Sequence, residues 1–268
     1  MYHNNEEWDM HPLDGNTGQA YLGISKNEKV FFKRNTSPFI AALAAEGITP
    51  RLKWTQRTYS GDILTAQEWE EGATLKAEDM NAPAVIDLIK SVHQHQSLVQ
   101  LMRRIHEKDC QPMDLILDYQ KDLPPSFSQH HFFNSVLEAM RQEIDSSLTT
   151  VPCVICHGDL NHNNFLLAND GTLYLVDWDN AKLADPLYDI TYLLCRYYPP
   201  SQWMDWLEAY DFPIDLHFTK RVRWYSLLAC LRLIKEYYQV DRHYQVNETV
   251  ILLRNIFENK EDSDATTP

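Results

Sequence analysis

Short apolar runs alternate with polar turns in the first part of the chain. This alternation is typical of β-strands joined by hairpins. The predicted strands cover residues 21–24, 29–33, 51–59 and 63–69. A short helix is expected over residues 37–46, because Ser37 and Pro38 suit its start and Gly47 suits the position after its end. The pattern predicts a small β-rich lobe with one helix that ends near residue 72.

Helical spacing dominates the rest of the chain. Apolar side chains recur every three or four positions between residues 83 and 107, which predicts one long helix there. A strand at 151–155 and a hairpin at 165–178 interrupt this pattern, and the hairpin turns at Asn169-Asp170-Gly171. Further helices are expected at about 132–148, 188–198, 201–210, 217–238 and 244–257. A small β-rich lobe followed by a large helical lobe gives an α+β fold.

Composition excludes several classes of protein. An apolar share of 44% and a charged share of 23% are typical of soluble globular proteins. The formal net charge of −14 argues against nucleic-acid binding, which favours basic patches. No apolar run reaches the length of a membrane span, and the polar residues 1–9 do not resemble a signal peptide. Five cysteines, an odd number, favour a reducing cytoplasm over a disulfide framework.

The segment from Cys156 to Asn164 contains the clearest chemical signal. Asp159 is followed five residues later by Asn164, and Asp177 follows after the predicted hairpin. Phosphoryl transfer uses one carboxylate to orient the acceptor hydroxyl, and an amide oxygen and a second carboxylate to hold Mg²⁺. Each residue by itself would be read as a turn former or a cap. Together they predict an ATP- and Mg²⁺-dependent kinase with Asp159 as catalytic base and Asn164 and Asp177 as metal ligands.

Other residues are candidates for nucleotide binding. Lys33 ends an apolar strand before the first helix, where a phosphate-binding lysine is expected. Glu46 is a possible partner for Lys33, but it stands at the end of that helix. The turn containing Gly15 and Gly18 could cover the phosphates with backbone N–H groups. The backbone of Gln67-Glu68-Trp69, at the end of the first lobe, is expected to meet the adenine.

Several aspartates and histidines have a structural interpretation. Asp179 could reach a second metal ion or stand in a solvated turn. Asp185 is expected to cap the helix that begins at Pro186, and Asp185 and Asp189 could brace the catalytic loop. Three histidines are expected to be surface or packing residues of the long helix: His93, His95 and His106.

Two further patterns leave alternatives open. Cys153-Val154-Ile155-Cys156-His157 fits the C-x-x-C-H pattern of haem attachment and C-x-x-C also suits zinc or redox chemistry, but core packing is favoured. Five aromatic residues could line a cage for a quaternary ammonium or stack on a sugar or base, although helical spacing favours the core. They are Tyr197, Tyr198, Trp203, Trp206 and Trp224.

These motifs resemble the aminoglycoside phosphotransferase/choline kinase family. The resemblance is carried by His157-Gly158-Asp159, Asn164, Val176-Asp177-Trp178 and the segment from Asp185 to Asp189. It implies a bilobal protein-kinase-like fold. With the boundaries that the strand and helix pattern gives, the nucleotide-binding lobe covers residues 1–72 and the helical catalytic and substrate lobe covers 73–257. The polar composition of residues 258–268 predicts a disordered tail. The resemblance also implies ATP and Mg²⁺ as cofactors and a small hydroxylated metabolite as acceptor. Amino alcohols such as choline or ethanolamine, ribose-type sugars and nucleosides are the leading acceptors.

Within that family, three segments resemble the YtmP/CcrZ type of Firmicute proteins. The segments are residues 33–39, 45–48 and 65–69. Such proteins are regarded as cell-cycle regulators that work with the division protein FtsZ. The resemblance therefore implies FtsZ as a partner and recruitment to the division site. A kinase-fold adaptor that binds a division protein without needing catalysis is the alternative function.

Overall fold

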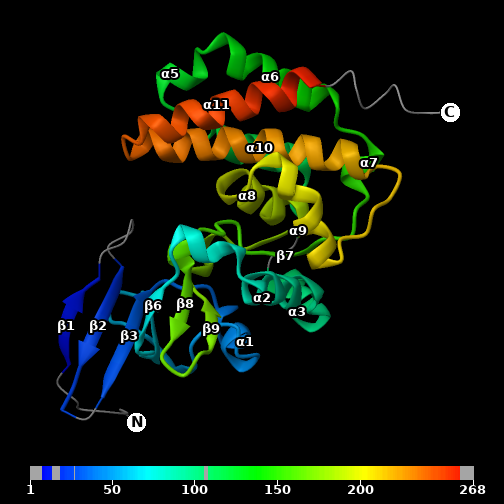
Figure 1. Cartoon of the computed structure of the whole chain (residues 1–268). Helices are drawn as coiled ribbons and strands as arrows, with labels where there is room; N and C mark the ends of the chain where they lie inside the picture. Colours follow the sequence, from blue (N-terminus) through cyan, green and yellow to red (C-terminus); the bar gives the residue numbers. More distant parts are fainter. Residues whose placement is uncertain (1–7, 14–18, 27, 106–107, 260–268) are drawn as a thin grey trace. The chain divides into compact units, whose positions relative to one another are not determined.

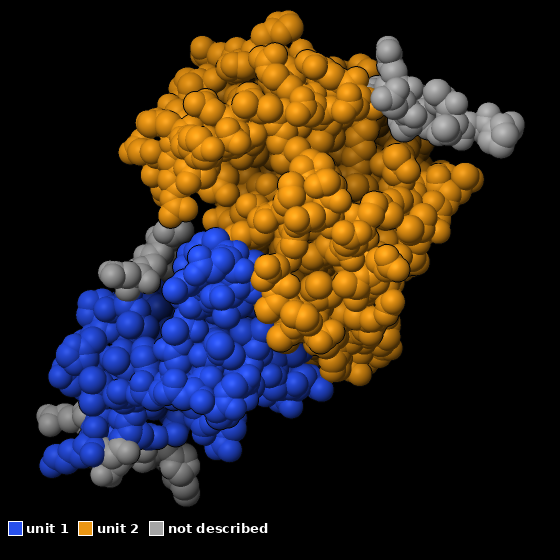
Figure 2. Space-filling model, in the orientation of Figure 1, with its two compact units in different colours: residues 1–80, 162–180 blue, residues 81–161, 181–268 orange. Residues whose placement is uncertain are grey.

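The computed structural model describes residues 8–13, 19–26, 28–105 and 108–259 (Figure 1). These residues form two compact units (Figure 2). Unit 1 combines the described residues of Met1–Met80 with His162–Asn180, and unit 2 combines Asn81–Asn161 with the described residues of Ala181–Pro268. Unit 1 therefore contains the segment 162–180 in addition to the predicted first lobe. The predicted tail at 258–268 lies outside the described residues from residue 260 onward.

A five-stranded antiparallel sheet forms the centre of unit 1. Its spatial order is β1-β2-β3-β5-β4, with bounds Asp9–Pro12, Ala20–Ile24, Lys29–Arg34, Ile63–Glu68 and Leu52–Arg57 in that order. Helix α1 (Ile40–Ala45) follows β3, and Gly47, at φ 70°, follows its end as predicted. The N-cap of α1 is Phe39, whose N–H donates to the Ser37 hydroxyl at 3.3 Å. Ser37 therefore supports the turn before the helix and not its first turn.

Alternation along β3 decides where its side chains point. Val30 and Phe32 are buried on one face, where they pack with Ala66 in an apolar cluster. Because successive side chains of a strand point to opposite faces, Lys33 lies on the other face. Lys33 is opposite Ala20 of β2 and Thr65 of β5. Strand β3 thus presents the Lys33 side chain on the face opposite the apolar cluster.

A second, three-stranded sheet of order β6-β8-β9 completes unit 1. The hairpin of β8 (Phe165–Ala168) and β9 (Leu173–Leu175) turns where predicted, and Gly171 there has φ 92°. Strand β6 (Gly72–Thr74) pairs with β8 and was not predicted. Gly72 is required there, because a Cβ at this position would stand 2.2 Å from the carbonyl oxygen of Leu167.

Unit 2 is mainly helical around one short two-stranded ladder. Strand β7 (Val154–Cys156) pairs antiparallel with β10 (Lys182–Ala184), and helices α2 (Pro83–Gln94) and α3 (Gln96–Ile105) contact this ladder. Helices α8 (Leu187–Tyr197) and α11 (His243–Glu258) both contact the long helix α10 (Phe218–Gln239) (Figure 1). The remaining helices of this unit are α4 (Pro112–Gln120), α5 (Pro125–Ser128), α6 (His131–Gln142), α7 (Ser146–Thr149) and α9 (Trp203–Tyr210). Short 3₁₀ segments lie at Pro200–Gln202 in this unit, at His162–Asn164 and Trp178–Asn180 in unit 1, and at Ala77–Asn81 where the chain passes from unit 1 to unit 2.

The structure corrects three helix predictions. The helix expected over 83–107 breaks at His95, whose ψ of 85° is not helical, so that α2 and α3 can each contact β7. The helix expected over 132–148 ends at Gln142, and Asp145 caps the separate helix α7 by accepting from the Ser147 N–H at 3.0 Å. Helices α4 and α5, each with proline in its first turn, lie in the Pro- and Asp-rich stretch 110–128, for which the sequence pattern predicts no helix.

Among the described helices, none combines the length and the apolar character that crossing a membrane requires.

Candidate functional site

Lys33 forms the centre of a charged group in unit 1. Its Nζ lies 2.6 Å from Oδ1 of Asp177 and 2.8 Å from Oδ2 of Asp179. Burial alone would lower the pKa of Lys33, but the hydrogen bonds and charges of the two aspartates outweigh it and raise that pKa above its usual value. Lys33 therefore carries a full positive charge at neutral pH. Glu46, the other candidate partner, is exposed at the C-cap of α1.

The hairpin of β8 and β9 brings the two predicted metal ligands together. Asn164 precedes β8 and Asp177 follows β9, and the Val176 N–H donates to the Asn164 carbonyl oxygen at 2.8 Å. The Leu175 N–H donates to the Ile48 carbonyl oxygen at 2.9 Å, which ties the hairpin to the loop after α1. Asn164 is buried, whereas the Asp177 side chain is half exposed. An amide and a carboxylate therefore stand at one end of the hairpin.

The backbone at Asp177 is strained. Its φ is 64°, in the left-handed region that few residues other than glycine adopt. The next residue, Trp178, is buried and donates its Nε1–H to the Leu175 carbonyl oxygen at 2.8 Å, which fixes this turn. Such strain costs about 1–3 kcal/mol and is concentrated at functional sites. Here it aims the Asp177 carboxylate at Lys33.

The predicted nucleotide-binding segments have different outcomes. Gly15 and Gly18 lie outside the described residues. The side chain of Gln67 is buried and donates to the Pro50 carbonyl oxygen at 2.8 Å, and the Glu68 N–H donates to the Arg51 carbonyl oxygen at 2.8 Å. Trp69 follows β5 with its indole nitrogen buried. These bonds hold the end of β5 in unit 1, and adenine binding by this segment stays a prediction.

Asp159 belongs to unit 2, where it contacts Tyr192, and Tyr192 in turn contacts Glu236 and Arg196. Sequence reasoning singled out none of these three side chains. The Tyr192 hydroxyl lies 3.1 Å from Oδ1 of Asp159 and 2.6 Å from Oε2 of Glu236. Arg196 donates to the same hydroxyl at 2.9 Å and to Glu236 at 3.1 Å. Burial raises the pKa of Tyr192 well above its usual value, and the Glu236 charge adds to the rise, so the hydroxyl keeps its proton. That proton can go to only one carboxylate at a time.

Asp189 holds the backbone that precedes Asp159. Its two carboxylate oxygens accept the N–H groups of His157 at 2.6 Å and Gly158 at 2.9 Å. His93 reaches Oδ2 of the same carboxylate at 3.3 Å through Nε2. All of these residues are buried, so the carboxylate is fixed by three donors. The bracing role expected of Asp189 is present, and His93 is a packing residue with a defined partner.

Asp185 makes a second buried anchor. It accepts the Leu187 N–H at 2.9 Å in the turn before α8, whose N-cap is Pro186 and not Asp185 as predicted. It also pairs with both Nε and Nη2 of Arg221 at 2.9 Å each. A bidentate pair of this kind fixes both partners in orientation as well as in distance. Because Arg221 comes from α10, the pair joins the start of α8 to the longest helix of the unit.

The cysteine motif has a packing role. Cys153 and Cys156 are free thiols, and the buried Cys156 Sγ donates to the carbonyl oxygens of Ala184 and Asp185. Burial raises the pKa of Cys156 well above its usual value and that of Cys153 to about 12, which suppresses the thiolate that metal or redox chemistry uses. One group of described residues, His93, Cys156 and Asp189, has the spacing of metal ligands. The oxygens of Asp189 in this group already accept hydrogen bonds from His157, Gly158 and His93.

The aromatic candidates are divided between buried and half-buried positions. Trp224 and Trp206 are buried, and Trp224 donates to the Met140 carbonyl oxygen at 2.9 Å, as core residues do. Trp203 donates to the carbonyl oxygen of Tyr198 at 3.1 Å, within the same local turn. Tyr197 is half-buried, and the guanidinium of Arg196 lies 5.7 Å from its ring centroid. The core interpretation therefore holds for the two buried tryptophans.

Four side chains around the loop were missed: Tyr192, Arg196, Arg232 and Glu236. Their spacing contained a signal, because Tyr192 and Arg196 are four residues apart on α8, and Arg232 and Glu236 are four residues apart on α10. Residues at this spacing share a helix face. Nothing in the sequence indicated that these two faces meet each other.

Known proteins share both sequence features and fold with this chain. A protein of Metamycoplasma hominis, described as uncharacterized, is 25% identical over 143 residues, which are 47% of this chain and 28% of that protein. This chain thus matches less than a third of that relative's length. The family model described as "Phosphotransferase enzyme family" matches residues 31–212.

Solved structures cover nearly the whole chain. Choline kinase LicA from Streptococcus pneumoniae superimposes with a TM-score of 0.68 at 16% identity, covering 92% of this chain and 93% of that one, and LicA has also been solved in complex with AMP. A choline/ethanolamine kinase family protein from Mesorhizobium loti has a TM-score of 0.60 at 16% identity, with 95% and 90% covered. The GDP and kanamycin complex of APH(2")-IIIa has a TM-score of 0.57 at 16% identity, with 94% of both chains covered.

These similarities confirm the predicted α+β, kinase-like fold: an antiparallel sheet with a helix, followed by a helical region. The matched family segment contains Lys33, Asp159, Asn164 and Asp177 and spans more than half of the sequence. The chain therefore belongs to the phosphotransferase enzyme family.

Proposed function

We propose that this protein transfers the γ-phosphoryl group of ATP, with Mg²⁺, to a hydroxyl of a small metabolite. The observation that carries the proposal is the group at the end of the β8–β9 hairpin, where Lys33 pairs with Asp177 and the preceding residue, Val176, donates its N–H to the Asn164 carbonyl oxygen. Membership of the phosphotransferase family supports the reaction class. The acceptor is an amino alcohol such as choline or ethanolamine, or a ribose-type sugar or nucleoside.

Unit 1 supplies the groups for the nucleotide. The carboxylates of Asp177 and Asp179 exceed the charge of Lys33 by one, and Asn164 adds a neutral oxygen, a donor set that suits Mg²⁺. Asn164 and Asp177 would hold the ion, which neutralises negative charge on the phosphates when bound. Lys33 is rigid and charged, so it can bind a phosphate oxygen in exchange for one aspartate. The end of β5 would receive the adenine.

Unit 2 supplies the base. Asp159 would accept a hydrogen bond from the acceptor hydroxyl and take its proton as the new O–P bond forms. Asp189 keeps the loop of Asp159 in place through the N–H groups of His157 and Gly158. The division into a nucleotide lobe at 1–72 and a catalytic lobe at 73–257 is part of this proposal, with 162–180 grouped with the first unit.

The test is phosphoryl transfer by the purified protein with MgATP. Pools of amino alcohols, sugars and nucleosides are offered as acceptors, and Asp159→Asn serves as the matched variant because it keeps the shape of the side chain. We expect transfer to one pool and a loss of about 10²–10⁴-fold in Asp159→Asn. If transfer to that pool were equal in both proteins, Asp159 would not be the base.

A role in cell division is the second candidate. It is supported by the resemblance of residues 33–39, 45–48 and 65–69 to the YtmP/CcrZ type, and it includes binding of FtsZ at the division site. A strain whose chromosomal gene encodes the Asp159→Asn protein separates catalysis from partner binding. Protein level and melting temperature are the controls. Loss of normal division would support a role for catalysis, and unchanged division would support an adaptor.

A further inference from the structure

Two guanidinium groups cover the aromatic faces next to the proposed base. Arg232 lies over the rings of Tyr188 and Tyr192, at 4.5 and 4.7 Å from their centroids, and it donates to the carbonyl oxygen of Gly158. Arg196 lies over Tyr192 and Tyr237, at 5.7 and 5.3 Å. These distances are within the range of cation–π contacts. The ring of Tyr192, whose hydroxyl reaches Asp159, therefore already has two of the protein's own cations within cation–π distance.

The charges in the same place are balanced. Asp159 and Glu236 contribute two negative charges, and Arg196 and Arg232 contribute two positive charges. The carboxylate of Asp189 also acts on Arg232, but it is buried and already accepts from His93, His157 and Gly158. Glu236 is the carboxylate that could attract a cationic head group, since its side chain is 38% exposed. Its Oε2, however, already accepts from Arg196 and from the Tyr192 hydroxyl. A cation brought to this place would find little surplus negative charge and would meet two fixed guanidinium groups.

The acceptor has to come close to these groups. A catalytic base works within hydrogen-bond distance of the hydroxyl that it deprotonates. In choline or ethanolamine the nitrogen is two carbons from the hydroxyl, so its charge would lie within a few ångströms of the residues bonded to Asp159. A polyhydroxylated acceptor would instead meet a carboxylate, a phenol and a guanidinium, all of which can form hydrogen bonds with hydroxyl groups.

We propose that the acceptor is an uncharged polyhydroxy compound of the sugar type, and that Arg196 excludes cationic amino alcohols from the site of Asp159. The inference rests on the proposed function and narrows its acceptor class. Arg196 acts by covering the tyrosine rings and by neutralising Glu236, and it takes no part in moving the proton.

Matched pairs of acceptors test the charge alone. Choline is compared with 3,3-dimethylbutan-1-ol, which replaces the quaternary nitrogen by carbon, and glucosamine is compared with glucose; ribose is included as a further uncharged acceptor. The readout is kcat/KM for phosphoryl transfer from MgATP. We expect the uncharged member of each pair to be preferred by about tenfold or more, the ratio that corresponds to about 1.4 kcal/mol.

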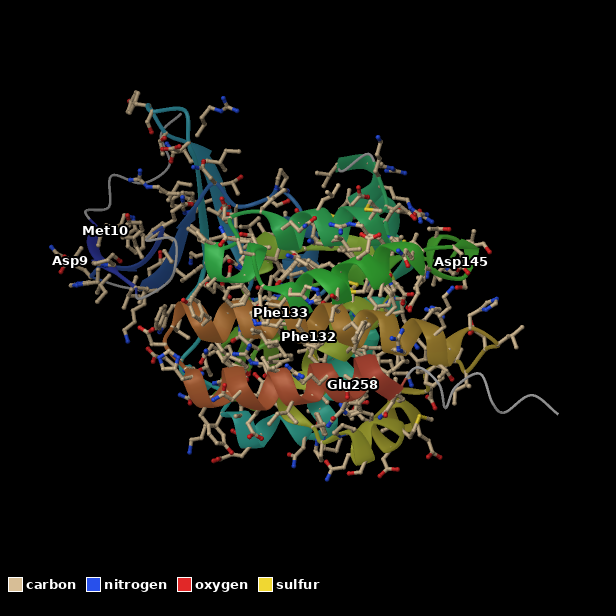
Figure 3. The ribbon with its side chains drawn as sticks, turned by 90° about the horizontal axis from the view of Figure 1, so that it is seen from above. Asp9, Met10, Phe132, Phe133, Asp145 and Glu258 are labelled. Atoms are coloured by element: carbon tan, nitrogen blue, oxygen red, sulfur yellow. The ribbon has the colours of Figure 1, made fainter. Side chains whose placement is uncertain are left out.

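Three variants assign the preference to Arg196. Arg196→Met keeps a long side chain without charge, and we expect it to raise the cationic-to-uncharged ratio by about tenfold. Arg196→Lys keeps the charge and should keep the preference. The control is Arg254→Met, which removes an exposed guanidinium that lies 4.7 Å from the ring centroid of Phe132 on α6 (Figure 3) and should leave the ratio unchanged.

The outcomes separate the two proposals. Preference for the uncharged members, reduced in Arg196→Met and kept in Arg196→Lys, supports the inference. Equal or better use of choline and glucosamine by the unmodified protein overturns the inference and leaves the proposed function standing. If no acceptor gave transfer that depends on Asp159, the proposed function would fall and the inference with it.

Discussion

Lys33 and Asp177 are 144 positions apart in the chain and form an ion pair of 2.6 Å. The first belongs to a central strand, and the second to a strained turn after the β8–β9 hairpin. The ammonium group is buried and the carboxylate is half exposed, so the pair has one fixed and one accessible partner. This arrangement suits a lysine that exchanges an aspartate for a phosphate.

We expect Lys33→Met to lower kcat/KM for ATP by about 10²–10³-fold, because it removes a positioned charge from the phosphates. The free energy of unfolding should change by less than about 1 kcal/mol, since the lost partners are half-exposed carboxylates. Steady-state kinetics and urea unfolding measure the two effects. Lys29→Met is the matched control, because Lys29 begins the same strand but pairs with the exposed Glu71. Equal kinetic losses in both variants would argue against the role of Lys33.

Asp189→Asn should damage both folding and transfer. An amide oxygen can accept from only part of the donor set, and its NH₂ group would face the N–H groups of His157 or Gly158. Removing one partner from a buried charged network costs about 3–5 kcal/mol. Urea unfolding would report this loss, and kcat should fall in the protein that remains folded. A stability within about 0.5 kcal/mol of the unmodified protein would show that the carboxylate does not anchor the loop.

From the environment of the Asp189 carboxylate we also expect the stability of the protein to depend on pH. Burial by itself would raise the pKa of Asp189, but the His93 hydrogen bond and nearby charges outweigh it and lower that pKa below 3.8. A depressed folded-state pKa gives stability that is present above the unfolded-state value and is lost as pH falls through the folded-state value. The stability difference between unmodified protein and Asp189→Asn should therefore be constant above about pH 5 and shrink below about pH 4. Denaturant unfolding across this range checks it; a difference that grows on acidification would reverse the sign.

Two glycines should respond differently to alanine. In Gly72→Ala the new Cβ would collide with the backbone of Leu167 at 2.2 Å, and the β6–β8 pairing would have to move. In Gly171→Ala the new Cβ meets nothing within 4 Å, and the cost is the φ of 92°, about 1–2 kcal/mol. We expect the larger loss of melting temperature in Gly72→Ala. The reverse order would mean that β6 is not held against β8 as described.

Local spacing was enough to find the residues on which the proposed function depends. Asp159 and Asn164 belong to one loop, and Asp177 follows a hairpin whose turn chemistry is explicit at Gly171, so no long-range contact had to be guessed. Lys33 could be predicted from the sequence for a similar reason. Alternation marks its strand, and Gly47 marks the end of the helix that follows.

Features that depend on tertiary contacts could not be predicted. Strands β6 and β10 have three residues each, too short for a period to be recognised. They form because β6 pairs with β8 and β10 pairs with β7. The break at His95 lets α2 and α3 each pack on β7, and no glycine or proline in the sequence indicates it. The link from Asp159 through Tyr192 to Glu236 joins three separate parts of the chain, so only the fold reveals it.

Phosphoryl transfer from γ-labelled ATP by Asp159→Asn, with MgATP affinity determined on the same sample, tests the central claim most directly. The account predicts that nucleotide affinity stays within about threefold, since Asp159 is assigned to the acceptor and not to the nucleotide, while transfer to the preferred acceptor falls by about 10²–10⁴-fold. Transfer at the rate of the unmodified protein, with nucleotide bound normally, would contradict the account.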